Sequence, residues 1–426
     1  MFILILSMMV ITSEHTRIST LSMEYQIAQG QPSQEAPQIY DPEIKVSPPQ
    51  DGVYNSANTN FGGTEDEVST QSILDYQKLI DKKIVWAYFS NNWIDEIRFP
   101  EESVKIIDNL DIVPFIRMMP RTTFTEGIAD PVFTLQSIID GKFDKELTQW
   151  ALDAKRTNIP LMVEFGTEAN GDWFPWSGIL NGADETDNYG DPKIPDGPER
   201  FRDAYKHIID LFNNLDVNNI TWVFHMVPSE DAGDIDPSET WNSIENYYPG
   251  DDYIDWIGTS IYGSIKPGEE WKSFTDVLNN TYTELSSLSS DKPIAILEFG
   301  VIDDPKSGNK SEWIQSALQT IESESYPRIK AISYWNEKWE DGNVIDLTVN
   351  SSREVADTFR NLISSSFFLT DAQYQFDGEN QSSYLEALTG KGYALDNSGN
   401  YSGAVEYFDH VLDIEPNNVD ALTWKR

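Results

Sequence analysis

Eight short apolar segments recur along the middle of the chain, and stretches with the pattern of amphipathic helices lie between them. The segments are 52–57, 84–89, 111–117, 161–167, 220–225, 253–259, 293–299 and 330–335. Short apolar runs that alternate with helices are typical of parallel strands covered on both faces. Eight such repeats predict an α/β protein with a (β/α)8 TIM barrel over residues 52–365. A doubly wound open sheet is the alternative, but no glycine-rich phosphate loop follows the first strand.

The helix expected at 198–215 illustrates the pattern. Pro198 suits the first helical position, because the amide hydrogen that proline lacks has no partner there. The apolar residues of this segment recur at helical spacing. They fall on one face: Phe201, Tyr205, Ile208 and Phe212. We therefore expect this face to pack against the sheet.

The charge balance narrows the classes of partner. The chain has 30 Lys and Arg against 71 Asp and Glu, a net charge of −41. A nucleic-acid binder needs a basic surface, so we expect no nucleic-acid partner, and an anionic membrane surface is disfavoured as well. The absence of cysteine excludes disulfides, thiolate nucleophiles and iron–sulfur clusters, and only four histidines argue against a metal site. At 39% hydrophobic residues, the chain can bury a large core.

The segments before the expected barrel differ from it in composition. Residues 1–30 begin with an apolar run at 2–11 that resembles the core of a signal peptide, although no Lys or Arg precedes it. We interpret residues 1–30 as a signal-like or leader segment and expect a secreted or cell-surface protein. Residues 31–51 are rich in Pro and Gln and predict a linker. A second linker is expected at 366–384.

The last segment, 385–426, contains a short internal repeat. Ala-Leu-Thr-Gly-Lys at 387–391 recurs 34 positions later as Ala-Leu-Thr-Trp-Lys. This period resembles that of tetratricopeptide repeats, of which about three copies are needed to bury their faces. Four further residues fit the spacing of such a repeat: Gly392, Ala404, Phe408 and Pro416. We predict a short all-α tetratricopeptide-like tail that offers a surface to a protein partner; two helices capping the barrel are the alternative.

Polar and aromatic residues lie at or just beyond the ends of the predicted strands, where barrel active sites are found. They are Arg117, Glu168, His225, Tyr262, Glu298 and Trp335. Two carboxylic acids across one barrel mouth are what glycoside hydrolysis requires, one to protonate the leaving oxygen and one to attack the anomeric carbon. Trp173 and Trp176 follow Glu168 closely, and aromatic faces beside a carboxylate indicate a saccharide site. Glu298 ends an apolar strand, where a carboxylate is unfavourable unless it is hydrogen-bonded or functional.

Three segments resemble glycoside hydrolase family 26, the β-mannanase family: 160–176, 247–258 and the strand around Glu298. The resemblance covers about 52–365 and implies a retaining mechanism, with Glu168 as acid/base and Glu298 as nucleophile. It also implies that Tyr262 hydrogen-bonds the nucleophile and that Trp335 forms the floor of the sugar site. We expect four further substrate-binding residues: Arg117, Trp173, Trp176 and His225.

Two positions depart from the family pattern. Thr167 stands where the family usually has a His that contacts the reacting sugar, and Glu164 stands where it usually has Arg. Strand alternation places Glu164 on the same side as Glu168, and we interpret it as a buried partner of Arg117. The departures leave the preferred sugar open, because the family also contains members that act on β-glucans or xylan.

The sequence thus predicts a retaining, endo-acting β-glycoside hydrolase on a plant- or microbe-type polysaccharide, with β-1,4-mannan favoured over β-glucan or xylan. The mechanism needs no metal or organic cofactor. A non-catalytic carbohydrate-binding barrel in an envelope or exopolysaccharide assembly is the rival hypothesis; the departures at Glu164 and Thr167 favour it, and the two retained carboxylates oppose it. A scaffold acting through the tail ranks last, because so few repeats form no groove.

Overall fold

The computed structural model of the protein describes residues 43–426, apart from 234–238, 341–343, 377–380, 398 and 426. The predicted leader segment at 1–30 lies outside the described residues, as does most of the first predicted linker. Within the part of the chain that is described, no helix is both long enough and apolar enough to cross a bilayer.

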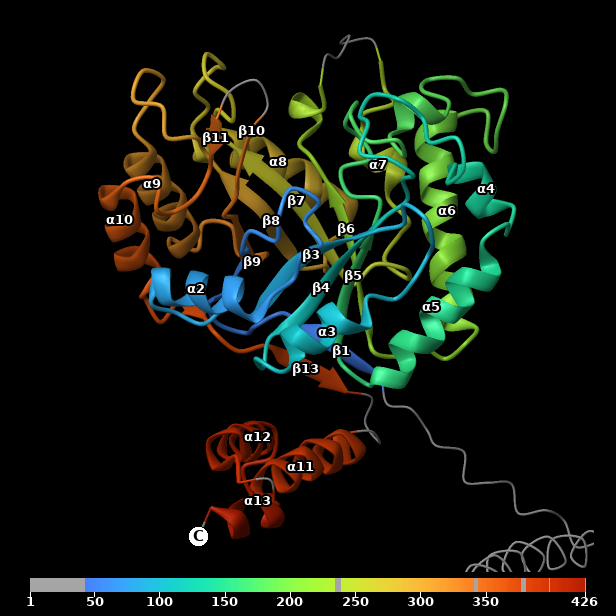
Figure 1. Cartoon of the computed structure of the whole chain (residues 1–426). Coiled ribbons are helices and arrows are strands. Elements are labelled where there is room, and N and C mark those ends of the chain that lie inside the picture. The colour runs from blue at the N-terminus through green and yellow to red at the C-terminus, as the bar shows by residue number, and fades with distance from the viewer. Residues whose placement is uncertain (1–42, 234–238, 341–343, 377–380, 398, 426) are drawn as a thin grey trace, which may run out of the picture. The chain divides into compact units, whose positions relative to one another are not determined.

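Eight parallel strands form a closed barrel (Figure 1). They are β2 (Val53–Asn58), β3 (Trp86–Asn92), β4 (Val113–Met119), β5 (Leu161–Phe165), β6 (Ile220–Met226), β7 (Trp256–Tyr262), β8 (Ile294–Gly300) and β9 (Ile329–Trp335). Each pairs with the next along the chain, and β2 also pairs with β9 in a register that matches Tyr54 with Ala331 and Asn58 with Trp335. This closure confirms the predicted barrel and excludes the open sheet.

Helices surround the strands (Figure 1). They are α2 (Thr70–Ile80), α3 (Glu101–Asp108), α4 (Leu135–Ile139), α5 (Asp144–Thr157), α6 (Asp196–Asn213), α7 (Ile244–Tyr247), α8 (Phe274–Leu288), α9 (Lys310–Glu322) and α10 (Arg353–Ile363). Helix α6 begins two residues before Pro198, and its predicted apolar face is entirely buried. Full burial of each such side chain stabilises the fold by about 1.5–3 kcal/mol, which is why the apolar face faces the sheet.

The strands carry two apolar layers because successive side chains point to opposite faces. One large cluster lies between the strands and the helices. A second cluster fills the barrel interior with large side chains, among them Tyr54, Trp86, Phe115 and Trp256. Tyr54 stacks on Trp256 with ring centroids 6.2 Å apart. The interior is therefore a packed core on which a site can be built at one end.

Both predicted linkers contain strands, which corrects their boundaries. Strand β1 (Ile44–Ser47) lies in the expected linker 31–51 and pairs antiparallel with β13 (Gln373–Phe376) in the expected linker 366–384. Strand β12 (Phe368–Leu369) adds to β2, so the barrel domain continues past residue 365. Strand pairing and the buried side chains of Ile44, Val46 and Phe368 stabilise these segments. The composition of 31–51, rich in Pro and Gln, gives no sign of this.

The tail forms three helices, α11 (Gln381–Asn397), α12 (Tyr401–Ile414) and α13 (Val419–Trp424). Gly392 lets α11 approach α12, since a Cβ atom there would lie only 2.9 Å from the ring of Phe408. Phe408 also stacks on Trp424, with ring centroids 4.6 Å apart. A helical hairpin followed by one more helix is compatible with the expected tail, and its assignment to tetratricopeptide repeats stays a prediction.

Candidate active site

Strand alternation brings three predicted site residues together inside the barrel. Arg117 on β4, Glu164 on β5 and His225 on β6 each lie two residues after an apolar residue of the interior cluster. Side chains two residues apart on a strand share a face, so all three point inward above the packed core. Each is at most 3% exposed.

A register shift directs Glu298 into the same space. The pairing of β8 with both of its neighbours is irregular near this residue, and such bulges re-aim side chains. The carboxylate accepts a hydrogen bond from the Tyr262 hydroxyl to Oε2 at 2.7 Å. Its Oε1 atom lies 3.3 Å from Nη2 of Arg117. The contact between Tyr262 and Glu298 is the one that the family resemblance implies.

Glu168 lies in a turn after β5 and has a φ of 53°, an uncommon conformation for a residue with a side chain. Its backbone N–H donates to the carbonyl of His225 at 3.0 Å. The Asn170 side chain accepts from the N–H of Val227 and donates to its carbonyl, at 3.0 and 2.8 Å. These bonds anchor the turn to β6 and offset backbone strain of about 1–3 kcal/mol.

The two carboxylates share one small compartment. An oxygen of Glu168, an oxygen of Glu298 and a ring nitrogen of His225 all lie within 4.8 Å of one another. Glu168 is 7% exposed and Glu298 is 5% exposed, so both retain slight access to solvent. Two negative charges this close repel each other strongly, so each carboxylate changes the electrostatic surroundings of the other.

The electrostatic surroundings of the two carboxylates differ. The pKa of Glu298 is raised to about 7, chiefly because the carboxyl group is buried and further because Glu168 is close. Arg117, His225 and the Tyr262 hydroxyl oppose this rise by favouring the ionised form. Glu168 instead accepts bonds from the neutral donors Ser260, at 2.5 Å, and Trp173, at 3.2 Å. The cationic partner therefore lies at Glu298, where it favours the ionised carboxylate.

Arg117 links three carboxylates. Its guanidinium lies 2.5 Å from Glu65, 3.3 Å from Glu164 and 3.3 Å from Glu298. The predicted pairing of Arg117 with Glu164 is confirmed. Burial alone would raise the pKa of Glu164, but His225, Arg117 and the Tyr88 hydroxyl together hold it below its usual value. Glu164 is therefore an ionised structural partner rather than a proton donor.

The aromatic residues divide between the site and the core. Trp173 is half-buried, and its indole N–H donates to Glu168. Gly171 makes room for that ring, since a Cβ atom there would lie 2.5 Å from it. Trp335, 5% exposed, lies beside Arg117 with the guanidinium 5.4 Å from its ring centroid. Trp176 differs from the expectation, because it is 1% exposed, so it supports the turn from within instead of facing a substrate.

Three residues at the site were not foreseen from the sequence: Tyr88, Ser260 and Glu65. Ser260 lies two positions before Tyr262 on β7, so alternation from Tyr262 could have found it. Tyr88 lies on β3 and donates to Glu164 at 2.6 Å. Glu65 comes from the loop after β2, and no sequence pattern signals its contact with Arg117.

Among the described residues, one group of acids and histidines could offer a metal ion three close ligand atoms: Glu168, His225 and Glu298. Both ring nitrogens of His225 are already hydrogen-bonded, Nδ1 to Glu164 at 3.1 Å and Nε2 to Ser260 at 2.9 Å. The Arg117 guanidinium beside Glu298 also repels a cation. The donor set therefore suits proton transfer between protein groups better than metal coordination.

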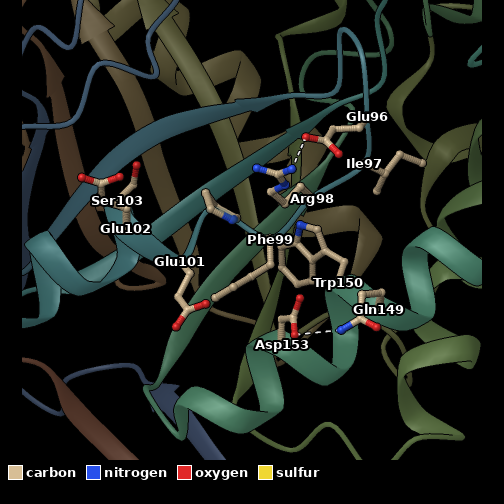
Figure 2. A pocket seen from close by; sticks show the side chains of 11 residues that line it. Glu96, Ile97, Arg98, Phe99, Glu101, Glu102, Ser103, Gln149, Trp150 and Asp153 are labelled. Carbon is tan, nitrogen blue, oxygen red and sulfur yellow. Dashed lines mark hydrogen bonds and ion pairs between the residues drawn. The ribbon is translucent and has the colours of Figure 1, made fainter.

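A pocket of about 510 Å³ lies apart from this site, between the segment that leads into α3 and helix α5 (Figure 2). Acidic and aromatic side chains dominate its lining: Glu96, Phe99, Glu101, Glu102, Trp150 and Asp153. Glu96 at its rim pairs with Arg98, which is itself largely exposed. None of the predicted site residues lines this pocket, so it is separate from the candidate active site.

A comparison with known protein families identifies the family of this chain. Residues 133–346, just over half of the chain, match glycosyl hydrolase family 26. The chain belongs to this family. The matched segment contains both carboxylates, and the protein is accordingly a glycosyl hydrolase of family 26. This confirms the family resemblance of the sequence motifs.

Three proteins that are similar to this family 26 hydrolase share 27% or less of its sequence. Endoglucanase H of Acetivibrio thermocellus is 27% identical over 317 residues, which cover 74% of this chain and 31% of that protein. The chain thus spans about a third of the length of this relative. The catalytic domain of the Bacillus sp. JAMB-750 endo-β-1,4-mannanase superposes with a TM-score of 0.53 and 16% identity, covering 75% of this chain and 87% of that domain. A Cellulomonas fimi endo-β-1,4-mannanase double mutant gives the same TM-score and identity, with coverages of 75% and 72%. At 16% identity, these two superpositions show a shared fold alone.

Proposed function

We propose that this family 26 hydrolase cleaves internal β-linkages of a polysaccharide with net retention, using Glu168 as acid/base and Glu298 as nucleophile. The observation that carries the proposal is the separation of the two carboxylates, which approach within 4.8 Å. Retaining glycosidases hold these groups about 5–5.5 Å apart, whereas inverting enzymes need about 6.5–9.5 Å to admit a water molecule. The close approach of the two groups fits the retaining separation better than the inverting one and so supports direct attack by Glu298.

The charges fit these roles. Arg117 and Tyr262 stabilise negative charge on Glu298, as a nucleophile requires. Glu168, with only neutral donors, can hold the proton that the leaving oxygen needs and later remove one from water. Glu298 departs in the second step, and two inversions at the anomeric carbon give retention.

For the substrate, we propose β-glucan as the first candidate. Endoglucanase H, which aligns with 74% of this chain, is named for action on glucan. Thr167 is 1% exposed and lies 2.8 Å from the Nδ1 atom of His225, so it is not free to bind a sugar hydroxyl. Because Thr167 replaces the family's usual His, the expected contact of that His with the reacting sugar is absent. Glucose and mannose differ only at C2, so the loss of one sugar contact bears on the choice between them.

β-1,4-Mannan, which the sequence motifs favour, is the second candidate. The experiment that separates the two is reducing-end release from mixed-linkage β-glucan, cellulose, β-mannan and xylan by the intact protein. Proton NMR during the first minutes of reaction identifies the anomer that forms. We expect the β-anomer first and products of mixed length. Initial appearance of the α-anomer would contradict the retaining mechanism, and binding of a polymer without hydrolysis would favour the carbohydrate-binding barrel.

The raised pKa of Glu298 predicts the acidic side of the pH profile. Its ionised form is the nucleophile, so we expect kcat/KM to fall as the pH drops through about 7. The substitution Tyr262→Phe removes a donor to Glu298, which favours the protonated form and raises the pKa. We expect the acidic limb to move to higher pH in this variant. The control Tyr334→Phe removes a buried hydroxyl that bonds the Leu347 carbonyl, and an equal movement there would contradict the assignment.

Two further proposals concern the rest of the chain. We propose that the protein is secreted or attached to the cell surface, because polysaccharides of this kind lie outside the cell. The apolar run at 2–11 supports export, although it falls outside the described residues. We also propose that α11–α13 provide a surface for a protein partner. Pull-down with the full chain and with a chain ending at residue 380 tests this role.

A further inference from the structure

A continuous chain of hydrogen-bonding groups leads from the interior of the barrel to Glu168. Nδ1 of His225 lies 3.1 Å from Oε2 of Glu164, and Nε2 lies 2.9 Å from the Ser260 hydroxyl oxygen. Ser260 donates to Oε1 of Glu168 at 2.5 Å. The four residues are between 1% and 7% exposed, so bulk water offers few alternative partners. Their bonds to one another therefore decide where the hydrogen atoms lie.

The donor-to-acceptor direction of these hydrogen bonds is set at Glu164. Tyr88 donates to its Oε1 atom at 2.6 Å, and Nε of Arg117 lies 3.3 Å from the same oxygen. These donors keep Glu164 ionised, and an ionised carboxylate can only accept. Oε2 of Glu164 therefore favours a proton on Nδ1 of His225. The Thr167 hydroxyl, 2.8 Å from that nitrogen, can accept from the same proton.

His225 is surrounded by negative groups. Burial alone would lower its pKa, but the Glu164 carboxylate, with smaller contributions from Glu298 and Glu168, raises it above the usual value. Ser260 has one hydroxyl hydrogen and donates it to Glu168, so Nε2 of His225 is the donor to the Ser260 oxygen. The hydroxyl hydrogen of Ser260 is then directed to Glu168.

Glu168 thus presents two unlike oxygens. Oε1 accepts the short bond from Ser260, and a proton placed on that oxygen would compete with it. Oε2 accepts only the longer bond, 3.2 Å, from the half-buried Trp173. A protonated carboxyl group keeps its hydrogen on the oxygen that is less strongly engaged as an acceptor.

We propose that Ser260 and His225 are positioning residues that keep the catalytic proton of Glu168 on Oε2. This inference rests on the proposed function of Glu168 as acid/base. In the first step the Oε2–H bond breaks, its proton moves to the glycosidic oxygen, the glycosidic C–O bond breaks and a Glu298 oxygen bonds the anomeric carbon. In the second step a water molecule gives a proton to Glu168, and the water oxygen bonds the anomeric carbon. The bond between that carbon and Glu298 breaks, and Glu298 leaves as a carboxylate.

The test compares Ser260→Ala with the wild type on phenyl and 2,4-dinitrophenyl β-cellobiosides and the matching mannobiosides. Phenolate needs protonation to leave, whereas 2,4-dinitrophenolate does not. If Ser260 positions the proton, kcat/KM falls about 10- to 100-fold for the phenyl glycoside and changes less than about threefold for the dinitrophenyl glycoside. Ser260→Thr restores the hydroxyl and is expected to recover most of the loss.

The pH profile gives an independent readout. Glu168 is faced by His225 from β6, Ser260 and Tyr262 from β7, Glu298 from β8 and Trp173 from its own loop. Loss of the Ser260 donor destabilises the ionised form of Glu168, so the acid form persists longer and the alkaline limb of kcat/KM moves to higher pH. His225→Gln removes the imidazole that bonds the Ser260 oxygen and is expected to move that limb in the same direction.

Ser333→Ala is the matched control. Ser333 is a fully buried serine on β9, and its hydroxyl has no hydrogen-bond partner among the described residues. We expect its activity to stay within about twofold of the wild type on both glycosides. Equal losses on the two leaving groups in Ser260→Ala, with an unmoved alkaline limb, would overturn the positioning role. No hydrolysis of any of these glycosides by the wild type would overturn the proposed function, and the inference with it.

Discussion

Replacement of Glu298 by Gln is expected to reduce kcat by roughly 10⁴- to 10⁶-fold, the loss found when a catalytic nucleophile is removed. The amide keeps the shape of the side chain but cannot form the glycosyl ester. It also loses the charge that Arg117 and the Tyr262 hydroxyl stabilise, at 3.3 and 2.7 Å. Initial rates on the polymer identified in the substrate panel measure the effect.

Glu199→Gln provides the matched control for that variant. Glu199 is 4% exposed and pairs with Arg202 at 2.9 Å on α6, so its substitution also changes a buried carboxylate. We expect a near-normal rate from it. Thermal unfolding of both variants separates loss of chemistry from loss of fold. A Glu298→Gln enzyme that folds normally and keeps more than about 1% of the rate would exclude Glu298 as the nucleophile.

The fold was accessible from the sequence because one physical signal repeats eight times. A buried parallel strand has to be apolar on both faces, so each of the eight strands stands out against the helices between them. Strand β1 at Ile44–Ser47 lacks this signal, because it has only four residues and buries only every second side chain while it pairs with β13. Composition therefore assigned it to a linker.

The site was accessible only where strand ends determine it. Alternation and strand position predict that Arg117, Glu164 and Glu168 come together, and the distances confirm the pairing of Arg117 with Glu164. Glu65 shows the limit of this reasoning, because it reaches Arg117 from a loop whose path depends on long-range contacts. Trp176 shows the converse limit. A tryptophan beside a catalytic motif has the same sequence signature whether it faces a sugar or supports the turn.

Replacement of Glu168 by Ala is expected to have an effect that depends on the leaving group. Loss of general acid catalysis costs about 10²- to 10⁴-fold in kcat/KM when the leaving oxygen needs a proton. A 2,4-dinitrophenyl glycoside needs none, so its glycosylation step should survive. The second step then lacks the base that activates water, and the glycosyl ester on Glu298 should accumulate. A burst of dinitrophenolate followed by slow turnover is the expected time course.

Sodium azide tests this interpretation directly. The azide anion attacks without loss of a proton, so it needs no base and can occupy the space that the missing carboxylate leaves beside Glu298. The expected product is the β-glycosyl azide, since attack on the ester from the opposite face restores the original configuration. In the wild type, the negative charge of Glu168 excludes the anion, so azide should not accelerate turnover. An α-azide product would mean that no covalent ester forms, and the close pair of carboxylates would then require another explanation. Absence of both burst and rescue, in a variant that still folds, would remove Glu168 from the acid/base role and direct attention to His225, whose ring nitrogen lies within 4.8 Å of the pair.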